Sequence, residues 1–190
     1  RPIKSCKKGI PEVTWGSYFS RMRKHPAWRT KNSVAWDVSV QGAREMNSLC
    51  IANPNIYYFS YVTSNTILDS TSNRHVPDKN MSYIIRANAR LMGMKKAYYS
   101  DGSETDSTWF ENDGIVNKKS MLGPTTGING SDPISNYRIN DILIPGQWYV
   151  MGEYKSDHRK FVGHSIRKEK FEELIKIYVE HLLLLWTLPK

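Results

Sequence analysis

Two segments of the sequence carry residues suited to acid–base chemistry. Trp109 to Asn117 contains Asp113 followed by glycine, which places a carboxylate on a tight turn with two β-branched apolar residues behind it. Gly152 to His158 ends on a histidine that can project from a loop, as a general base must. Taken separately, an Asp-Gly turn and a loop histidine are ordinary surface features.

The order of the two residues favours a joint role. Asp157 precedes His158 directly but is not expected to orient its ring, because neighbouring side chains in an extended segment point to opposite sides. An acid from elsewhere is therefore needed. In α/β-hydrolases the triad order along the chain is Ser, then Asp or Glu, then His, and Asp113 before His158 obeys it. We predict that the carboxyl group of Asp113 reaches the imidazole of His158.

The nucleophile is not found in the sequence. Gly163-His164-Ser165-Ile166-Arg167 resembles a Gly-x-Ser-x-Gly nucleophile elbow. The strained strand-to-helix turn of an elbow needs a small residue two places after the serine, and Arg167 does not fit. Ser165 also follows the histidine, against the required order. We therefore predict that Ser165 is not the nucleophile.

The surrounding pattern is that of an α/β protein. Apolar residues at helical spacing predict helices at 15–25, 41–52 and 168–187, the last built to cover a sheet. A near-continuous apolar run at 56–62 predicts a strand buried on both faces, as in a parallel sheet. A further strand is expected at 147–151.

Turn formers dominate 64–83 and 100–146, which we expect to be long loops. The inventory holds too few strands to bury the faces that its helices present. We expect residues 1–190 to form the C-terminal portion of one α/β domain whose N-terminal strands are missing.

Composition narrows the class of protein. The chain has 190 residues, of which 39% are hydrophobic and 24% charged, as in a folded protein. No apolar run is long enough to cross a bilayer. The net charge of +9 comes from cations scattered along the chain, which favours a solvated exterior. Aromatic and basic side chains are interleaved at one segment, which suits single-stranded nucleic acid but is explained more simply by an amphipathic helix. They are Trp15, Tyr18, Arg21, Arg23, Lys24 and Trp28.

The cysteines and glycosylation triplets leave the compartment open. Cys6 and Cys50 could form one disulfide, or Cys50 could be a buried thiol on the apolar face of its helix. Asn80-Met81-Ser82 and Asn129-Gly130-Ser131 fit the glycosylation pattern, which arises often by chance.

Several motifs, in order, resemble the thermostable-type secreted triacylglycerol lipases of Gram-positive bacteria, which belong to the α/β-hydrolase superfamily. The most specific are 109–117 continuing to 120–124, and 151–154 followed by Asp157-His158. Weaker similarity runs through 36–43, 53–60 and 76–81, whereas the opening dozen residues match poorly. The resemblance covers only the C-terminal half of that family's domain.

The resemblance implies a fold, an activity and a location. It implies a partial α/β-hydrolase fold, with Asp113 as triad acid and His158 as triad base. It also implies a lipid or ester substrate at an interface, and secretion. We expect no cofactor in these 190 residues. The family's nucleophile, oxyanion hole, lid and zinc ligands lie upstream of the matched region and cannot be carried over. We therefore expect the 190-residue chain alone to be inactive.

The sequence departs from the family at a calcium site. The family's ligands there are a glutamate two residues after the histidine and an aspartate seven after it, and this sequence has Lys160 and Ser165. Because an ammonium group cannot ligate a hard cation, we expect no calcium at this site. This departure and the basic charge leave a second hypothesis open, a non-catalytic lipase-like protein that binds a lipid surface or a protein partner.

Overall fold

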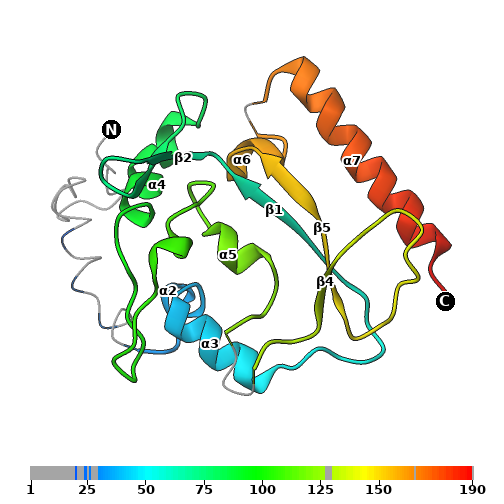
Figure 1. The fold of residues 1–190 in the computed structure, drawn as a ribbon, viewed down its shortest axis with the longest axis horizontal. Helices are drawn as coiled ribbons and strands as arrows, with labels where there is room; N and C mark the ends of the chain where they lie inside the picture. The colour runs from blue at the N-terminus through cyan, green and yellow to red at the C-terminus, as the bar shows by residue number, and fades with distance from the viewer. Residues whose placement is uncertain are drawn as a thin grey trace, which may run out of the picture.

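A parallel three-stranded sheet forms the centre of the computed structural model, which describes residues 20, 24, 26, 30–126, 130–164 and 166–189. Strand β5 (Trp148–Lys155) lies between β1 (Tyr58–Ser64) and β4 (Ile134–Asn136) (Figure 1). The register between β1 and β5 shifts at Ser60 to Val62. The parallel sheet with helices confirms the predicted α/β class, and both predicted strands are present.

A second, two-stranded sheet was not predicted. Strands β2 (Thr66–Asp69) and β3 (Arg74–Pro77) form an antiparallel hairpin within the segment expected to be a loop. The Ser, Thr and Asn residues between the strands, at 70–73, obscured the short strand segments on either side. Asn73 has a φ of 51°, a conformation that asparagine tolerates better than most residues.

The helices surround the sheet and the hairpin. They are α2 (Val34–Asp37), α3 (Val40–Leu49), α4 (Arg86–Met92), α5 (Lys118–Met121), α6 (His158–Phe161) and α7 (Lys168–Thr187), with 3₁₀ turns η2 (Tyr83–Ile85) and η3 (Ser107–Trp109). The predicted helix 168–187 is confirmed by α7, and the predicted helix 41–52 is confirmed but ends earlier. The predicted helix 15–25 lies almost wholly outside the described residues.

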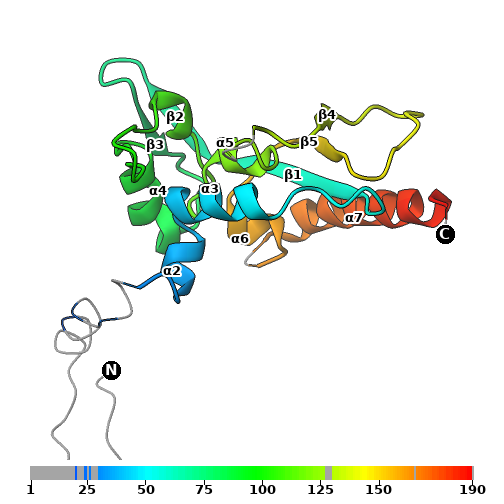
Figure 2. The same ribbon diagram turned by 90° about the horizontal axis from the view of Figure 1, so that it is seen from below.

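Helix α7 runs along one face of the sheet (Figure 2). The ring of His181 contacts Phe59 and Tyr61 of β1 edge-on, with ring centroids 5.0 and 5.5 Å apart. Tyr178 of α7 packs on Phe161 of α6. These aromatic contacts tie α7 to the strands and to the short helix that carries His158, as expected of a helix that covers a sheet.

The apolar side of α3 is exposed, contrary to expectation. Met46 is 50% and Leu49 82% exposed, and Cys50 is also exposed and not buried. The close packing of α3 is instead at Gly42, which leaves no room for a side chain against the Trp36 carbonyl. Pairing of Cys50 with Cys6 stays untested, because Cys6 lies outside the described residues.

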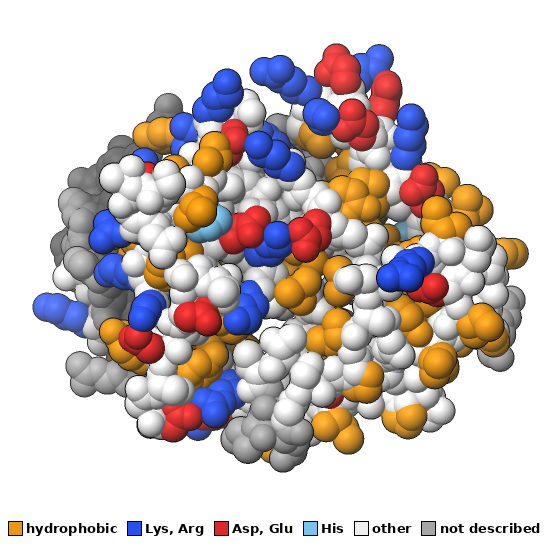
Figure 3. Space-filling model, viewed as in Figure 1, with side chains coloured by type: hydrophobic (Ala, Val, Ile, Leu, Met, Phe, Trp, Pro, Cys, Tyr) orange, Lys and Arg blue, Asp and Glu red, His pale blue; other side chains and the backbone are white. Residues whose placement is uncertain are grey.

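Large apolar side chains gather on the surface over the β4–β5 connection and the C-terminal half of α7 (Figure 3). They include Ile139, Ile142, Ile144, Leu182, Leu183 and Trp186. Exposed apolar side chains that gather in this way often belong to a surface that contacts another protein, a further part of the same protein or a lipid. Among the described residues, no helix is long and apolar enough to cross a membrane.

Candidate active site

The carboxylate of Asp113 is completely buried and fully hydrogen-bonded. Its Oδ1 accepts the backbone N–H groups of Ile115 at 3.0 Å and Val116 at 2.8 Å. Its Oδ2 accepts the hydroxyl of Thr63, from the end of β1, at 2.7 Å. A buried charge is tolerated only when it is bonded in this way. The Asp113 side chain is therefore fixed in place by both the sheet and its own turn.

The turn that carries Asp113 is held by Asn112, also completely buried. The Asn112 amide donates to the carbonyls of Ala89 (3.1 Å) and Phe110 (2.8 Å), and its Oδ1 accepts the N–H of Gly114 at 2.9 Å. Gly114 has a φ of 96°, which only glycine adopts readily. The Asp-Gly pair thus forms a braced turn inside the protein and not an ordinary surface turn.

His158 begins α6, just beyond the end of β5. Its backbone N–H donates to the carbonyl of Asp113 at 3.1 Å, and its Nδ1 lies 2.9 Å from Asp113 Oδ2. An ionised carboxylate can only accept hydrogen bonds, so this contact favours a proton on Nδ1 and a free lone pair on Nε2. The imidazole is partly open to solvent, with its side chain 41% exposed. The structure thus brings together the two residues that the sequence pairs.

Among the described residues, the hydrogen-bond partners of the Asp157 carboxylate are Ser82 and Lys160 and do not include the imidazole, in line with the sequence analysis. Its carboxylate is fully buried and caps α6 by accepting the N–H of Lys160 at 3.1 Å. It also accepts the backbone N–H of Ser82 at 2.8 Å and the Ser82 hydroxyl. Asp157 therefore joins α6 to the segment before η2 and leaves His158 to Asp113.

The segment before η2 has its own ordered carboxylate. Buried Asp78 accepts the N–H of Asn80 at 2.7 Å, and its Oδ2 lies 3.5 Å from the ammonium of Lys155. The Asn80 N–H and then the Lys155 charge hold the pKa of Asp78 below its ordinary value. Asp78 therefore stays ionised at neutral pH and links this segment to Lys155 at the end of β5.

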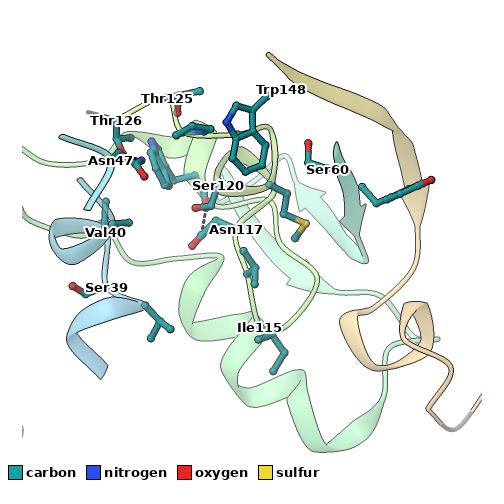
Figure 4. A pocket seen from close by; sticks show the side chains of 18 residues that line it. Ser39, Val40, Asn47, Ser60, Ile115, Asn117, Ser120, Thr125, Thr126 and Trp148 are labelled. Atoms are coloured by element: carbon teal, nitrogen blue, oxygen red, sulfur yellow. Dashed lines mark hydrogen bonds between the residues drawn. The ribbon is translucent and has the colours of Figure 1, made fainter. Parts of the chain in front are cut away.

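A cavity of about 690 Å³ adjoins the turn that carries Asp113. Figure 4 shows Ser60 and Trp148 of the sheet on one side of this cavity and Val40 and Asn47 of α3 on the other. Ile115, which holds the Asp113 carboxylate, also lines it. Ser60 Oγ and Trp148 Nε1 are buried and have no hydrogen-bond partner within the described ranges.

The roles of Thr63, Asn112, Asp157 and Ser82 in this site were not predicted from the sequence. Thr63 lies in strand β1, where a β-branched threonine indicates only a preference for β-sheet. Asp157 and Ser82 come from distant segments, although an aspartate at a helix start is a recognisable cap signal. Ser165 lies outside the described residues. Among those described, no cluster of three or more His, Cys, Asp or Glu side chains could hold a metal ion.

Comparison with known proteins gives one matching family model. The model for "Lipase-like, C-terminal domain" matches residues 4–184. Lipase 1 of Staphylococcus aureus is 28% identical over 161 residues, which are 83% of this chain and 21% of that protein. The lipase of Staphylococcus hyicus is 27% identical over 164 residues, 85% of this chain and 23% of that protein. The chain thus spans about a fifth of the length of these relatives.

Solved structures show the same relationship. The crystal structure of Staphylococcus hyicus lipase has a TM-score of 0.69 and 25% identity, covering 94% of this chain and 42% of that one. EstA from Clostridium botulinum has a TM-score of 0.67 and 30% identity, covering 84% of this chain and 38% of that one. The present fold therefore matches part of each of these structures.

Proposed function

The chain belongs to the lipase-like C-terminal domain family, and we propose on this basis that it supplies the acid and the base of a Ser-His-Asp ester hydrolase. Asp113 would be the acid and His158 the base. The serine would come from outside these 190 residues. The substrate would be a carboxylic ester of the triacylglycerol type, since the relatives are named lipases.

The observation that carries this proposal is the contact between His158 Nδ1 and Asp113 Oδ2 at 2.9 Å. The imidazole of His158 is partly exposed, whereas its partner, the Asp113 carboxylate, is wholly buried. A purely structural ion pair would not need an accessible lone pair on the imidazole. That asymmetry suits a base whose Nε2 must reach a reacting hydroxyl. Within the described part of the chain, no serine bonds to Nε2 of His158.

The proposed mechanism follows from this geometry. His158 Nε2 takes the proton of the serine hydroxyl as the serine oxygen attacks the ester carbonyl. Asp113 holds the imidazole tautomer and stabilises the imidazolium that forms. The imidazolium then protonates the leaving alcohol, and His158 removes a proton from the water that releases the acyl group.

The setting of this activity is part of the proposal. An enzyme reaches a water-insoluble ester at the interface between lipid and water. The exposed apolar side chains of the β4–β5 connection suit such a surface. We expect the protein to act outside the cell.

A second candidate function is a non-catalytic lipase-like protein that binds a lipid surface or a protein partner. Its support is the replacement of the family's cation-ligand positions by Lys160 and Ser165, together with the net charge of +9. The coding sequence upstream of Arg1 discriminates the two candidates. A Gly-x-Ser-x-Gly motif after a strand favours the hydrolase, and a frame without one favours the binding protein.

Hydrolysis of a soluble p-nitrophenyl ester and of a triglyceride emulsion tests the hydrolase directly. The natural polypeptide that contains this chain should hydrolyse both, and His158→Ala should abolish turnover. The matched control is His164→Ala, which changes an exposed histidine just after α6 and should keep full activity. The 190-residue chain alone should be inactive. Full activity in His158→Ala, or hydrolysis by the isolated chain that His158→Ala removes, would contradict the proposal.

A further inference from the structure

Asp157 is a buried carboxylate that the proposed mechanism does not use. It directly precedes His158 and is 0% exposed. Its hydrogen-bond donors come from its own helix and from Ser82, 75 positions away in the sequence. Whatever fixes the position of Asp157 therefore also fixes the start of α6, and with it the place of the imidazole.

The charge of Asp157 is balanced by Lys160. The Lys160 ammonium lies 3.4 Å from Asp157 Oδ2 and also donates to the backbone carbonyl of Asn80. It thus bridges an oxygen of α6 and an oxygen of the segment before η2. A buried carboxylate that loses its cation keeps an uncompensated charge, which is strongly destabilising.

These two oxygens are also what a hard cation would bind. Calcium takes carboxylate and carbonyl oxygens at about 2.3–2.6 Å. The Lys160 ammonium already contacts one oxygen of each kind. A divalent ion on the same pair of oxygens would lie close to this positive charge and be repelled by it. The residues present therefore do not fit the calcium ion that the family resemblance implies.

We propose that the ammonium of Lys160 is the cation of this site, a positioning group that ties α6 to Asn80 and keeps His158 facing Asp113 without calcium. This inference rests on the proposed function only in assigning His158 as the base. The tie itself is a property of the folded chain and can be measured without turnover.

Four variants of the full chain test the proposal. Lys160→Met keeps the length of the side chain and removes the charge, and Lys160→Arg restores a cation. Lys160→Glu reverses the charge and puts a second carboxylate beside Asp157. Lys170→Met is the matched control, because the exposed side chain of Lys170 pairs with Glu173 of the same helix and not with Asp157. Two readouts are taken for each, the melting temperature in calcium or in EDTA and the ¹H–¹⁵N signals of the His158 ring.

The wild-type chain should melt at the same temperature in millimolar calcium and in EDTA, and calcium alone should give no binding heat in calorimetry. Lys160→Met should lower the melting temperature and shift the His158 ring signals, Lys160→Arg should restore both, and Lys170→Met should change neither. Lys160→Glu should melt lower in EDTA and recover with calcium, since only this variant has an oxygen ligand at position 160.

Two results would overturn the proposal. One is a wild-type melting temperature that rises with calcium and falls with EDTA, which needs no variant to fold. The other is a Lys160→Met chain whose melting temperature and ring signals match those of Lys170→Met. Because neither readout needs ester hydrolysis, an inactive protein with an intact Lys160 tie would count against the proposed function alone.

Discussion

The hydrogen bond from the Thr63 hydroxyl to Asp113 Oδ2 can be tested by removing the hydroxyl. Asp113 Oδ2 accepts only two of the bonds described above, one from Thr63 at 2.7 Å and one from His158. Thr63→Val replaces the hydroxyl by a methyl group of similar size. Hydrogen bonds to charged groups contribute about 1.5–3 kcal/mol, and the site is buried, so the loss should fall in that range. For a chain of this length, 1 kcal/mol shifts the melting temperature by about 2–4 °C, which predicts a fall of about 3–12 °C.

Thr63→Ser separates the hydroxyl from the packing of the methyl group. It keeps the donor and removes one buried methyl, which costs about 0.5–1.5 kcal/mol by analogy with Ile→Val. Thermal unfolding and the ring signals of His158 are measured for both variants. Only Thr63→Val should move the ring signals, since only it removes the bond to Asp113. Equal ring signals in wild type and Thr63→Val would refute the reasoning, as would a Thr63→Val chain as stable as wild type.

Two further predictions concern Gly114 in the turn that carries Asp113 and His181 in helix α7. Gly114→Ala should lower the free energy of unfolding by roughly 2–4 kcal/mol in denaturant, because φ is 96° and the new Cβ would lie 2.7 Å from Ile85 Cδ1. An unchanged stability in Gly114→Ala would contradict this description of the turn. Burial against β1 lowers the pKa of His181. The unfolded chain therefore binds the proton first as pH falls, so stability should drop below about pH 6.5 and level off below the folded pKa. His181→Gln should flatten this pH dependence, and an unchanged slope would contradict it.

The sequence predicted elements whose pattern depends only on local spacing. Helix α7 was predicted with its observed bounds, because Phe171, Leu174 and Tyr178 repeat at helical intervals over twenty residues. Strands β1 and β5 were predicted because apolar and aromatic runs are typical of a parallel sheet. These elements carry their own signal and need no distant partner to be recognised.

What the sequence left out depends on contacts between distant segments. The exposure of Met46 and Leu49 on α3 could not be read from their helical spacing, since a periodic pattern says which residues share a side and not what covers it. The hairpin of β2 and β3 was hidden by its polar turn. Burial of Asp157 depends on Ser82 and could not be seen from either segment alone.

The candidate site was predicted in part. Asp113 and His158 were paired by chain order and by resemblance, and the contact between their side chains fits that pairing. Thr63 and Asn112, which hold Asp113 and its turn in place, were not predicted. In the sequence, Thr63 indicates only a strand and Asn112 only a turn. The effect of Lys160 was predicted only as the loss of a cation ligand. Its contact with Asp157 and Asn80 appears only once the segments are folded together.

The tautomer of His158 is the most direct measurement of the central claim, which is that Asp113 orients the imidazole of His158, the proposed base. A long-range ¹H–¹⁵N spectrum of the chain, recorded where the imidazole is neutral, should show the proton on Nδ1 and none on Nε2. Asp113→Asn, whose amide can donate to Nδ1, should move the proton to Nε2. A wild-type ring protonated on Nε2, or a ring unaffected by Asp113→Asn, would contradict the account.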